Sequence, residues 1–212
     1  MQEITTLVFD FGCVLVNLDK QRCIKSFCEI GAENIATYVD ECRQEDLFHD
    51  LEVGNIDIST FCDEVRRKAP CCKASDEAIC EAWNSLLTGI PVRRLRALLQ
   101  LKDRYRLLLL SNTNPIHWEK SLKDYFTADG KTFDDYFEKA YLSYQMQMLK
   151  PDRCIYESLM NDSRTTPEEI LFVDDSVANC AAAEQIGITT LHVTNGDEWI
   201  SKLNIDENNI LG

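Results

Sequence analysis

The chain has 212 residues, 45 % of them apolar, which is enough for a sizeable core and argues against global disorder. Its 22 basic and 36 acidic residues give a net charge of −14, which disfavours binding along a nucleic-acid backbone unless a basic stripe is present. The densest basic clusters, Arg93–Arg94–Arg96 and Arg66–Arg67–Lys68, have helical spacing and are interpreted as solvated helix faces.

The N-terminal residues enter a strand-like run directly, without the basic segment and the small-residue cleavage pattern of a signal peptide. The longest apolar runs, such as residues 107–110, are too short to span a bilayer. We therefore expect a cytoplasmic protein that binds neither membrane nor nucleic acid, and the sequence leaves open whether it is a monomer or a homodimer.

The first half of the chain changes from a strand to helices. Residues 4–9 are mostly β-branched or aromatic and predict a buried parallel strand, which stops at Asp10. From about residue 20 to residue 87 the apolar spacing is helical, with no convincing strand, and Asp57 or Ser59 is placed to cap a helix. We expect a helical cap domain over residues 17–90.

Cysteines are concentrated in this helical block. It contains seven of the ten, at positions 23, 28, 42, 62, 71, 72 and 80, and the chain has no CxxC pair. The chain is long and lacks an export signal, so we interpret them as reduced thiols that pack as small hydrophobic side chains, rather than as disulfides or a metal cluster. Cys71 and Cys72 form a candidate exposed, oxidisable pair.

The second half alternates between helices and strands. Strands are predicted in "YRLLLLSNTN", "KAYLSYQ", "EILFVDDS" and "ITTLHV", and helices lie between them, one of them closed by Gly187. This alternation predicts an α/β fold, a Rossmann-like three-layer α/β/α core with a parallel sheet, built from residues 1–16 and 91–212.

Three of the predicted strands end in polar residues. These ends are Asp10, Ser111–Asn112 and Asp174–Asp175. Ligands of such sheets bind beyond the carboxyl ends of the strands, so these residues are expected to meet at one edge. Carboxylates gathered there require a hard cation, for which Mg²⁺ is the natural choice. Lys150 follows another predicted strand and could balance a carboxylate and a phosphate.

The sequence resembles the haloacid dehalogenase-like (HAD) superfamily over nearly its whole length. Four motifs in order carry the resemblance: "FDFGCVLV", "LLLLSNTN", "LKPD" and "FVDDS". Within the superfamily it looks most similar to bacterial α-D-glucose-1-phosphate phosphatases with a four-helix cap, and more distantly to the N-terminal phosphatase domain of soluble epoxide hydrolases. The resemblance implies a Mg²⁺-dependent phosphatase that acts on a small phosphorylated metabolite, such as a sugar phosphate.

The resemblance also implies roles for individual residues. Asp10 would be the nucleophile that forms an aspartyl-phosphate, and it would bind Mg²⁺ together with the carbonyl of Gly12 and the carboxylate of Asp175. Asp174 would orient these groups without binding the metal directly, and Asn179 would help to fix the loop that contains Asp174 and Asp175.

The resemblance assigns phosphate binding to three other residues. Ser111, Asn112 and Lys150 would hold the phosphoryl oxygens and stabilise the charge of the transition state.

The sequence departs from the family pattern at Gly12. Most phosphatases of the superfamily carry an aspartate there, which protonates the leaving oxygen and then activates water. Such a group contributes about 10²–10⁴-fold to the rate. The similar glucose-1-phosphate phosphatases also have glycine at this place. His49 or Asp50, from the predicted cap, is a candidate for a replacement acid that would also affect specificity.

Two other functions remain open at this point. A 2-haloacid dehalogenase also uses an aspartate nucleophile without the second aspartate, but it needs no metal and lacks the Asp174–Asp175 pair. The protein could also bind a phosphorylated metabolite without catalysis, in which case Gly12 would reflect the loss of a catalytic aspartate. Asp10, Lys150 and Asp175 are nevertheless intact.

Overall fold

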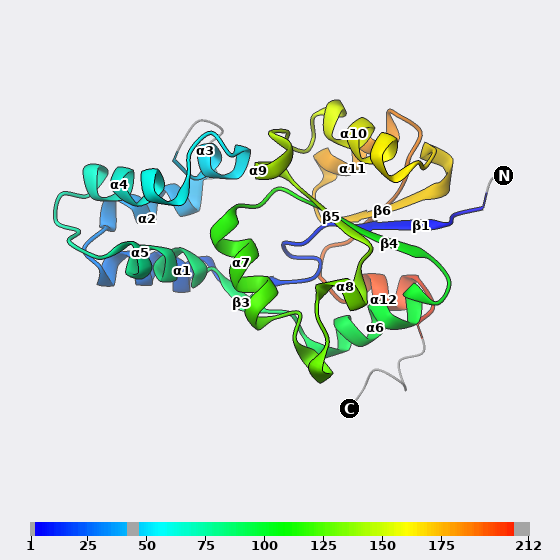
Figure 1. The fold of residues 1–212 in the computed structure, drawn as a ribbon, viewed down its shortest axis with the longest axis horizontal. Coiled ribbons are helices and arrows are strands. Elements are labelled where there is room, and N and C mark those ends of the chain that lie inside the picture. The colour runs from blue at the N-terminus through cyan, green and yellow to red at the C-terminus, as the bar shows by residue number, and fades with distance from the viewer. Residues whose placement is uncertain (1–2, 42–46, 206–212) are drawn as a thin grey trace.

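A five-stranded parallel sheet forms the centre of the protein, which a computed structural model describes over residues 3–41 and 47–205 (Figure 1). The strands lie in the order β5–β4–β1–β6–β7. They are β1 (Thr6–Phe9), β4 (Arg106–Ser111), β5 (Lys139–Leu142), β6 (Ile170–Asp174) and β7 (Thr189–His192). Every neighbouring pair is parallel, as the alternation of helices and strands predicts.

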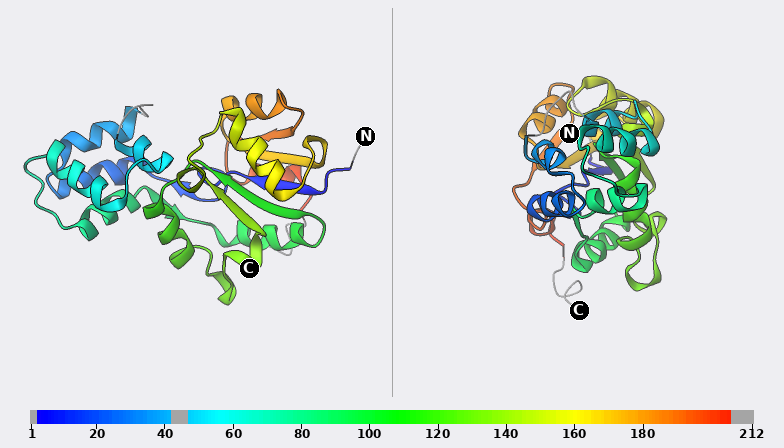
Figure 2. Two further views of the ribbon diagram at one scale, coloured as in Figure 1. Left: turned by 45° about the horizontal axis from the view of Figure 1, so that its top comes forward. Right: turned by 90° about the vertical axis from the view of Figure 1, so that its left-hand side faces the viewer.

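Helices cover both faces of this sheet. Figures 1 and 2 show α10 and α11 on one face and α6, α8 and α12 on the other. These helices are α6 (Val92–Lys102), α8 (Phe133–Tyr136), α10 (Arg153–Ser163), α11 (Val177–Glu184) and α12 (Glu198–Lys202). Alternate residues of β1 enter the two layers: Leu7 and Phe9 pack in one hydrophobic cluster and Val8 in another. The predicted three-layer α/β/α fold is confirmed.

A second group of helices lies to one side of the sheet (Figure 1). It contains α1 (Lys20–Glu29), α2 (Glu33–Glu41), α3 (Leu47–Val53), α4 (Ile58–Lys68) and α5 (Asp76–Asn84). These helices pack around their own hydrophobic cluster, which includes Phe27, Phe48, Phe61 and Trp83. We call this group the helical unit. As expected, Asp57 caps α4 by accepting from the backbone N–H of Thr60 at 2.8 Å.

The helical unit differs from expectation in two details. Its described residues form five helices rather than the four that the resemblance implies. Gly31 follows the end of α1 and Gly54 follows the end of α3, with φ of +76° and +79°. The chain also forms two short strands, β2 (Asn17–Leu18) and β3 (Leu87–Gly89), which pair antiparallel where it enters and leaves the unit. Strands of two and three residues are too short to produce a sequence pattern.

Short helices complete the part nearest the helical unit. These are α7 (Pro115–Asp124), after β4, and α9 (Ser143–Met146), directly after β5. Elsewhere in the sheet domain, 3₁₀ turns lie at Ala128–Gly130 and, just before β6, at Pro167–Glu169. The end of α3 approaches α9 so closely that a Cβ at Gly54 would lie 2.3 Å from the carbonyl oxygen of Tyr144. The helical unit therefore touches the sheet domain on the α9 side.

One arginine of the predicted solvated faces is buried instead. Arg94, only 4 % exposed, donates through one terminal nitrogen to the carbonyl of Leu15 and the side chain of Asn17, both at 2.8 Å, and through Nε to Asp197 at 3.0 Å. A Cβ at Gly196 would lie 2.4 Å from its guanidinium carbon. Helical spacing could not reveal these partners, because they come from both ends of the chain.

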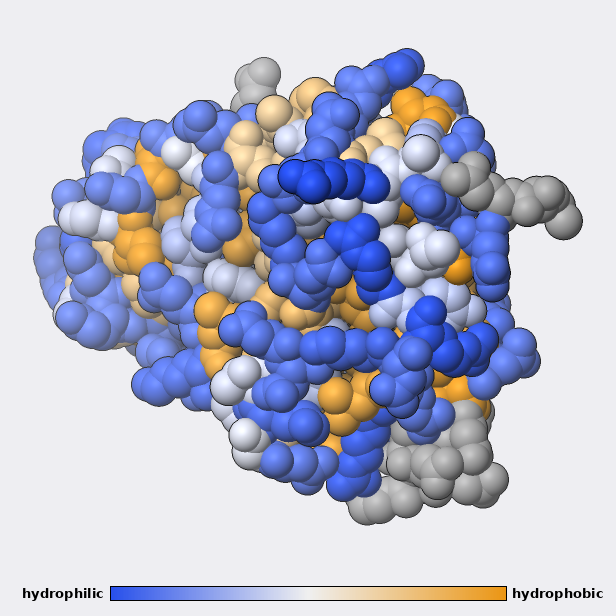
Figure 3. Space-filling view, turned by 45° about the vertical axis from the view of Figure 1, so that its right-hand side comes forward, coloured by the Kyte–Doolittle hydropathy of each residue, from blue (hydrophilic) through white to orange (hydrophobic). Residues whose placement is uncertain are grey.

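One face of the molecule is largely polar. Figure 3 shows a face on which hydrophilic residues predominate and hydrophobic areas are small and scattered. The helices within residues 3–41 and 47–205 are all too short or too polar to traverse a bilayer.

A buried histidine joins α7 to the end of α5. Asn114 accepts from the backbone N–H of His117 through Oδ1, at 3.0 Å, so its amide nitrogen must donate to His117 Nδ1, 3.2 Å away. His117 Nε2 then donates to the carbonyl of Trp83 at 3.1 Å. Both ring nitrogens are thus satisfied in the neutral form, and burial lowers the pKa of His117 to about 4.

We predict that this histidine makes stability fall in mild acid. Unfolded His117 has a pKa of about 6.5, so between pH 6.5 and pH 4 the unfolded chain binds the extra proton and unfolding is favoured. From pH 7 to pH 5 the free energy of unfolding from urea titrations should fall by about 2 kcal/mol more in the wild type than in His117→Gln. Identical pH dependence in the two proteins would contradict the prediction.

Candidate active site

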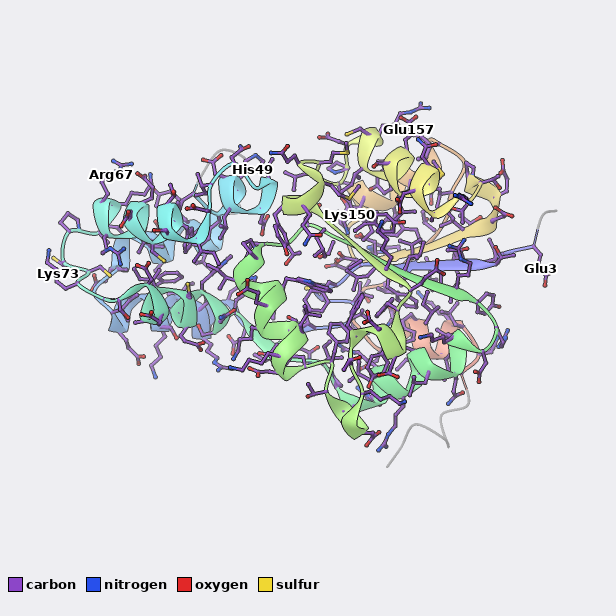
Figure 4. All side chains as sticks on the ribbon, viewed as in Figure 1. Glu3, His49, Arg67, Lys73, Lys150 and Glu157 are labelled. Atoms are coloured by element: carbon purple, nitrogen blue, oxygen red, sulfur yellow. The ribbon has the colours of Figure 1, made fainter. Side chains whose placement is uncertain are left out.

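The polar ends of three neighbouring strands meet at the carboxyl edge of the sheet. Asp10 follows β1, Ser111 ends β4 and Asp174 ends β6. Because β1 lies between β4 and β6 and all three run parallel, their ends are adjacent although the residues lie far apart in sequence. Figure 4 shows Lys150 at this part of the sheet.

A lysine ammonium group connects two of the strands. Lys150 Nζ donates to Asp10 Oδ1 and to Asp174 Oδ2, both at 2.7 Å. The lysine is 4 % exposed and Asp10 8 %, so these ion pairs are largely withdrawn from water. The ring of Phe172 lies beneath the ammonium, with its centroid 5.3 Å from Nζ.

The acidic loop after β6 is fixed by hydrogen bonds. Asp174 Oδ1 accepts from the backbone N–H of Ser176 at 2.8 Å, and the amide of Asn179 donates to both Asp174 oxygens at 3.1 Å. Together with Lys150, these donors occupy the Asp174 carboxylate. The neighbouring Asp175 is only half-buried, and its carboxylate is therefore the more accessible of the two.

The protonation of these groups follows from burial and from their neighbours. Burial, reinforced by the charge of Asp174, outweighs the attraction of Lys150 and raises the pKa of Asp10 to about 7. Burial and Asp174 also raise the pKa of Asp175. For Lys150, burial opposes the charge, but the two carboxylates outweigh it and raise the pKa of the ammonium group.

The acidic residues have the composition of a magnesium site. One oxygen from each of Asp10, Asp174 and Asp175 lies within 4.8 Å of the others. When all three are ionised, Lys150 leaves two net negative charges, which a divalent cation would neutralise. The carbonyl of Gly12 accepts from Val14 N–H at 2.6 Å and keeps a second lone pair. Carboxylate and carbonyl oxygens are the ligands that Mg²⁺ prefers, so the residues fit that ion.

The two residues expected to bind phosphate after β4 differ in their partners. Ser111 is buried, and among the residues that the structure describes its hydroxyl makes only a long contact, 3.4 Å, to the carbonyl of Asn112. The side chain of Asn112 instead brackets the backbone of Lys150, donating to its carbonyl and accepting from its N–H, both at 2.9 Å. The Asn112 side chain therefore positions Lys150, and its backbone N–H is the group left for an anion.

Position 12 offers no acid but does offer room. Among the described residues, the nearest neighbour of a Cβ at Gly12 would be Leu18 Cδ1, at 3.7 Å, an ordinary contact distance. Gly12 does not have a positive φ, in contrast to Cys13, with φ of 58°. A larger side chain at position 12 is therefore compatible with the backbone.

The candidate replacement acids lie on α3 of the helical unit. Figure 4 shows His49 on this helix, whereas Lys150 lies in the sheet domain. Asp50 accepts from the amide of Asn55 at 3.2 Å. The structure therefore does not assemble either residue with Asp10 and Lys150 in the way that it assembles the strand-end residues.

Three further residues support the site and were missed in the sequence. His192 Nε2 donates to the carbonyl of Asp175 at 3.0 Å, and the thiol of Cys13 lies near the Asp175 carboxylate and lowers its pKa, against the larger effect of burial. Ser143 Oγ exchanges hydrogen bonds of 2.9 Å with the backbone of Thr113. Ser143 and His192 also lie at strand ends, so the rule that identified Asp10 and Asp174 would have identified them.

Comparisons with known proteins agree with this geometry. The profile of the haloacid dehalogenase-like hydrolase family matches residues 4–187. A D-ribitol-5-phosphate phosphatase from Bacteroides thetaiotaomicron is 33 % identical over 205 residues, covering 95 % of this chain and 98 % of that protein. The family resemblance inferred from the motifs is confirmed.

Solved structures are similarly close. A HAD family enzyme from Bacteroides thetaiotaomicron, in complex with magnesium and inorganic phosphate, superposes with a TM-score of 0.89 at 40 % identity, covering 94 % of this chain and 98 % of that one. A HAD-like family hydrolase from Porphyromonas gingivalis gives a TM-score of 0.87 at 34 % identity, covering 96 % and 97 %.

We predict that Mg²⁺ binds at the carboxyl edge of the sheet. Isothermal titration of Mg²⁺ should detect one site in the wild type, and Asp175→Asn should weaken it about tenfold or more by removing a charged ligand. Asp103→Asn, an exposed substitution at the end of α6, should leave the affinity unchanged. Equal weakening by both substitutions would indicate only a general effect of charge.

Proposed function

Because the chain belongs to the haloacid dehalogenase-like hydrolase family, we propose that it is a Mg²⁺-dependent phosphatase that hydrolyses a sugar or sugar-alcohol phosphate through an aspartyl-phosphate. The observation that carries the proposal is the placement of Asp10. Its carboxylate lies 2.7 Å from the Lys150 ammonium and within 4.8 Å of an Asp175 oxygen, at an edge where a phosphate can approach.

In the proposed reaction a carboxylate oxygen of Asp10 attacks phosphorus. The bond from phosphorus to the ester oxygen breaks, and the alcohol leaves with its electron pair and takes a proton. Water then attacks the phosphorus of the aspartyl-phosphate, which releases inorganic phosphate and restores the carboxylate. Asp10, Asp175 and the Gly12 carbonyl would hold Mg²⁺, which would supply the positive charge that an anionic phosphate needs to approach these carboxylates.

The groups around Asp10 divide the remaining work. The Lys150 ammonium, already beside Asp10, neutralises charge on the phosphoryl oxygens. The Ser111 hydroxyl and the backbone N–H of Asn112 donate to the same oxygens. The Asn112 side chain holds the backbone of Lys150 in position through two hydrogen bonds. Asp174 and Asn179 act behind these groups by fixing the lysine and the acidic loop.

We assign residues 17–90 to a cap that covers the site and selects the substrate. Three observations support this division. The helical unit has a hydrophobic cluster of its own. The short strands β2 and β3 pair at the two places where the chain enters and leaves the unit. Finally, α3 meets α9 next to the strand ends. The sheet domain would then comprise residues 1–16 and 91–212.

The relative's substrate suggests a specific chemistry. Ribitol 5-phosphate is the ester of a primary alcohol, whose alkoxide is a poorer leaving group than an anomeric or aryl oxygen. An enzyme with Gly12 must therefore obtain the leaving-group proton elsewhere, and His49 and Asp50 on α3 remain the candidates within the cap. Phosphates of acyclic sugar alcohols and of sugars are the substrate class to test first.

We predict Mg²⁺-dependent phosphate release that requires Asp10. An aryl phosphate, glucose 1-phosphate, glucose 6-phosphate and ribitol 5-phosphate should be assayed with Mg²⁺ and with a chelator. Asp10→Asn should lower turnover at least about 10³-fold, because the nucleophile is lost, whereas Asp103→Asn should not. Release that persists in Asp10→Asn would contradict the mechanism, and no release by the wild type would favour a binding protein.

We predict that an acid restored at position 12 accelerates the reaction. Gly12→Asp should turn over ribitol 5-phosphate up to about 10²-fold faster than Gly12→Asn, which has the same shape but no proton to donate. The difference should shrink for the aryl phosphate, whose leaving group needs no proton. Equal rates for the two variants on ribitol 5-phosphate would mean that the acid already comes from another residue.

A further inference from the structure

Two cysteines on consecutive helices of the helical unit face each other. Cys62 lies in the middle of α4 and Cys80 in the middle of α5, and their sulfur atoms are 4.0 Å apart. The loop that joins the helices is held by Arg66, which donates to the carbonyl of Ala74 at 3.1 Å and to Asp76 at 2.7 Å. The spacing of the two cysteines is therefore fixed by the fold.

The two thiols have different surroundings. Cys62 is fully buried, and its thiol also approaches the carbonyl of Asp76, at 3.8 Å. Cys80 is half-buried and lines a surface cavity of about 210 Å³ between α5 and α7, which small molecules can enter. An oxidant would therefore reach Cys80 first and find Cys62 behind it.

The contact between them favours this order. The contact with Cys62 lowers the pKa of Cys80, although burial and the carboxylates of Asp76, Glu77 and Glu81 act in the opposite direction. The same contact, with burial, raises the pKa of Cys62, which therefore keeps its proton. An accessible cysteine with a lowered pKa beside a buried thiol is the arrangement of a peroxide-reactive cysteine and its resolving partner.

We propose that Cys62 and Cys80 form a reversible disulfide when the protein meets a hydroperoxide. The Cys80 thiol loses its proton, the thiolate attacks the peroxide, and the O–O bond breaks. A sulfenic acid forms, and the leaving oxygen takes up a proton to give one molecule of water or alcohol. Cys62 then attacks the Cys80 sulfur, an S–S bond forms, and the hydroxyl leaves with the thiol proton as water. The two thiols lose two electrons, and one peroxide gains them.

Forming this bond needs only a local movement. The sulfur atoms must approach from 4.0 Å to about 2.05 Å, which rotation of the two side chains on adjacent helices can provide. Cys71 and Cys72 are the competing candidates, because they are adjacent in sequence and Cys71 is exposed. Neighbours in sequence, however, form disulfides only in a distorted backbone, whereas Cys62 and Cys80 already face each other.

The sequence allows a direct test. Trypsin leaves Cys62 as the one cysteine of peptide 44–66, Cys80 as the one cysteine of peptide 74–93, and Cys71 with Cys72 in peptide 69–73. The protein should be treated with hydrogen peroxide, alkylated with N-ethylmaleimide, digested and analysed by mass spectrometry without reduction. We expect peptides 44–66 and 74–93 joined, with the loss of two hydrogen atoms, as the most abundant disulfide, and its disappearance on addition of dithiothreitol.

Variants decide the assignment. Cys80→Ser should abolish the joined peptide, whereas Cys28→Ser, a substitution of another half-buried cysteine of the helical unit, should leave it unchanged. Recovery of Cys80 as a sulfinic acid without the joined peptide would overturn the proposal. So would a disulfide that forms preferentially within peptide 69–73 or with any other cysteine. These outcomes are independent of phosphatase activity.

Discussion

The site depends on one buried ammonium group that binds carboxylates from two strands. Lys150 joins Asp10, after β1, to Asp174, at the end of β6, and Asn112, after β4, holds the lysine backbone from the third strand. Desolvating such a cluster costs free energy that the ion pairs recover only in part, so it is weak evidence for stability. The cluster instead holds the two carboxylates close together. Without Lys150, the buried carboxylates at the ends of β1 and β6 would repel each other.

The same ion pairs explain why the site is prepared for a cation and a phosphate. With Asp175 ionised, one lysine cannot neutralise three carboxylates, and burial raises the pKa of Asp10 and Asp175. A divalent cation would remove this penalty and keep Asp10 ionised, as its proposed role as nucleophile requires. The acidic cluster is therefore electrostatically incomplete by itself, and a positive ion completes it before an anionic substrate can approach.

Much of this site could be predicted from the sequence because it follows a topological rule. Hydrophobic runs that end at Asp10, Ser111 and Asp174 must meet if the sheet is parallel, and the motif around Lys150 adds the cation. What the sequence could not reveal depends on contacts between distant segments. Helical spacing predicts that Arg94 lies on a solvated helix face, but the residue is buried and donates to Leu15 and Asp197. The strands β2 and β3 are stabilised only by pairing with each other, so neither has a pattern of its own.

The distribution of hydrogen bonds also indicates where substrate selection must reside. Around the strand ends, Asn112 is occupied by Lys150, Asn179 by Asp174, and His192 by the carbonyl of Asp175. Side chains committed in this way position the proposed phosphate-binding groups and keep few donors and acceptors for the alcohol of a substrate. Gly12 contributes no side chain. The nearest neighbour of a side chain at this position would be Leu18, in β2, where the chain enters the helical unit. We therefore infer that, in the proposed phosphatase, the helical unit and the segments that connect it to the sheet domain discriminate between alcohols.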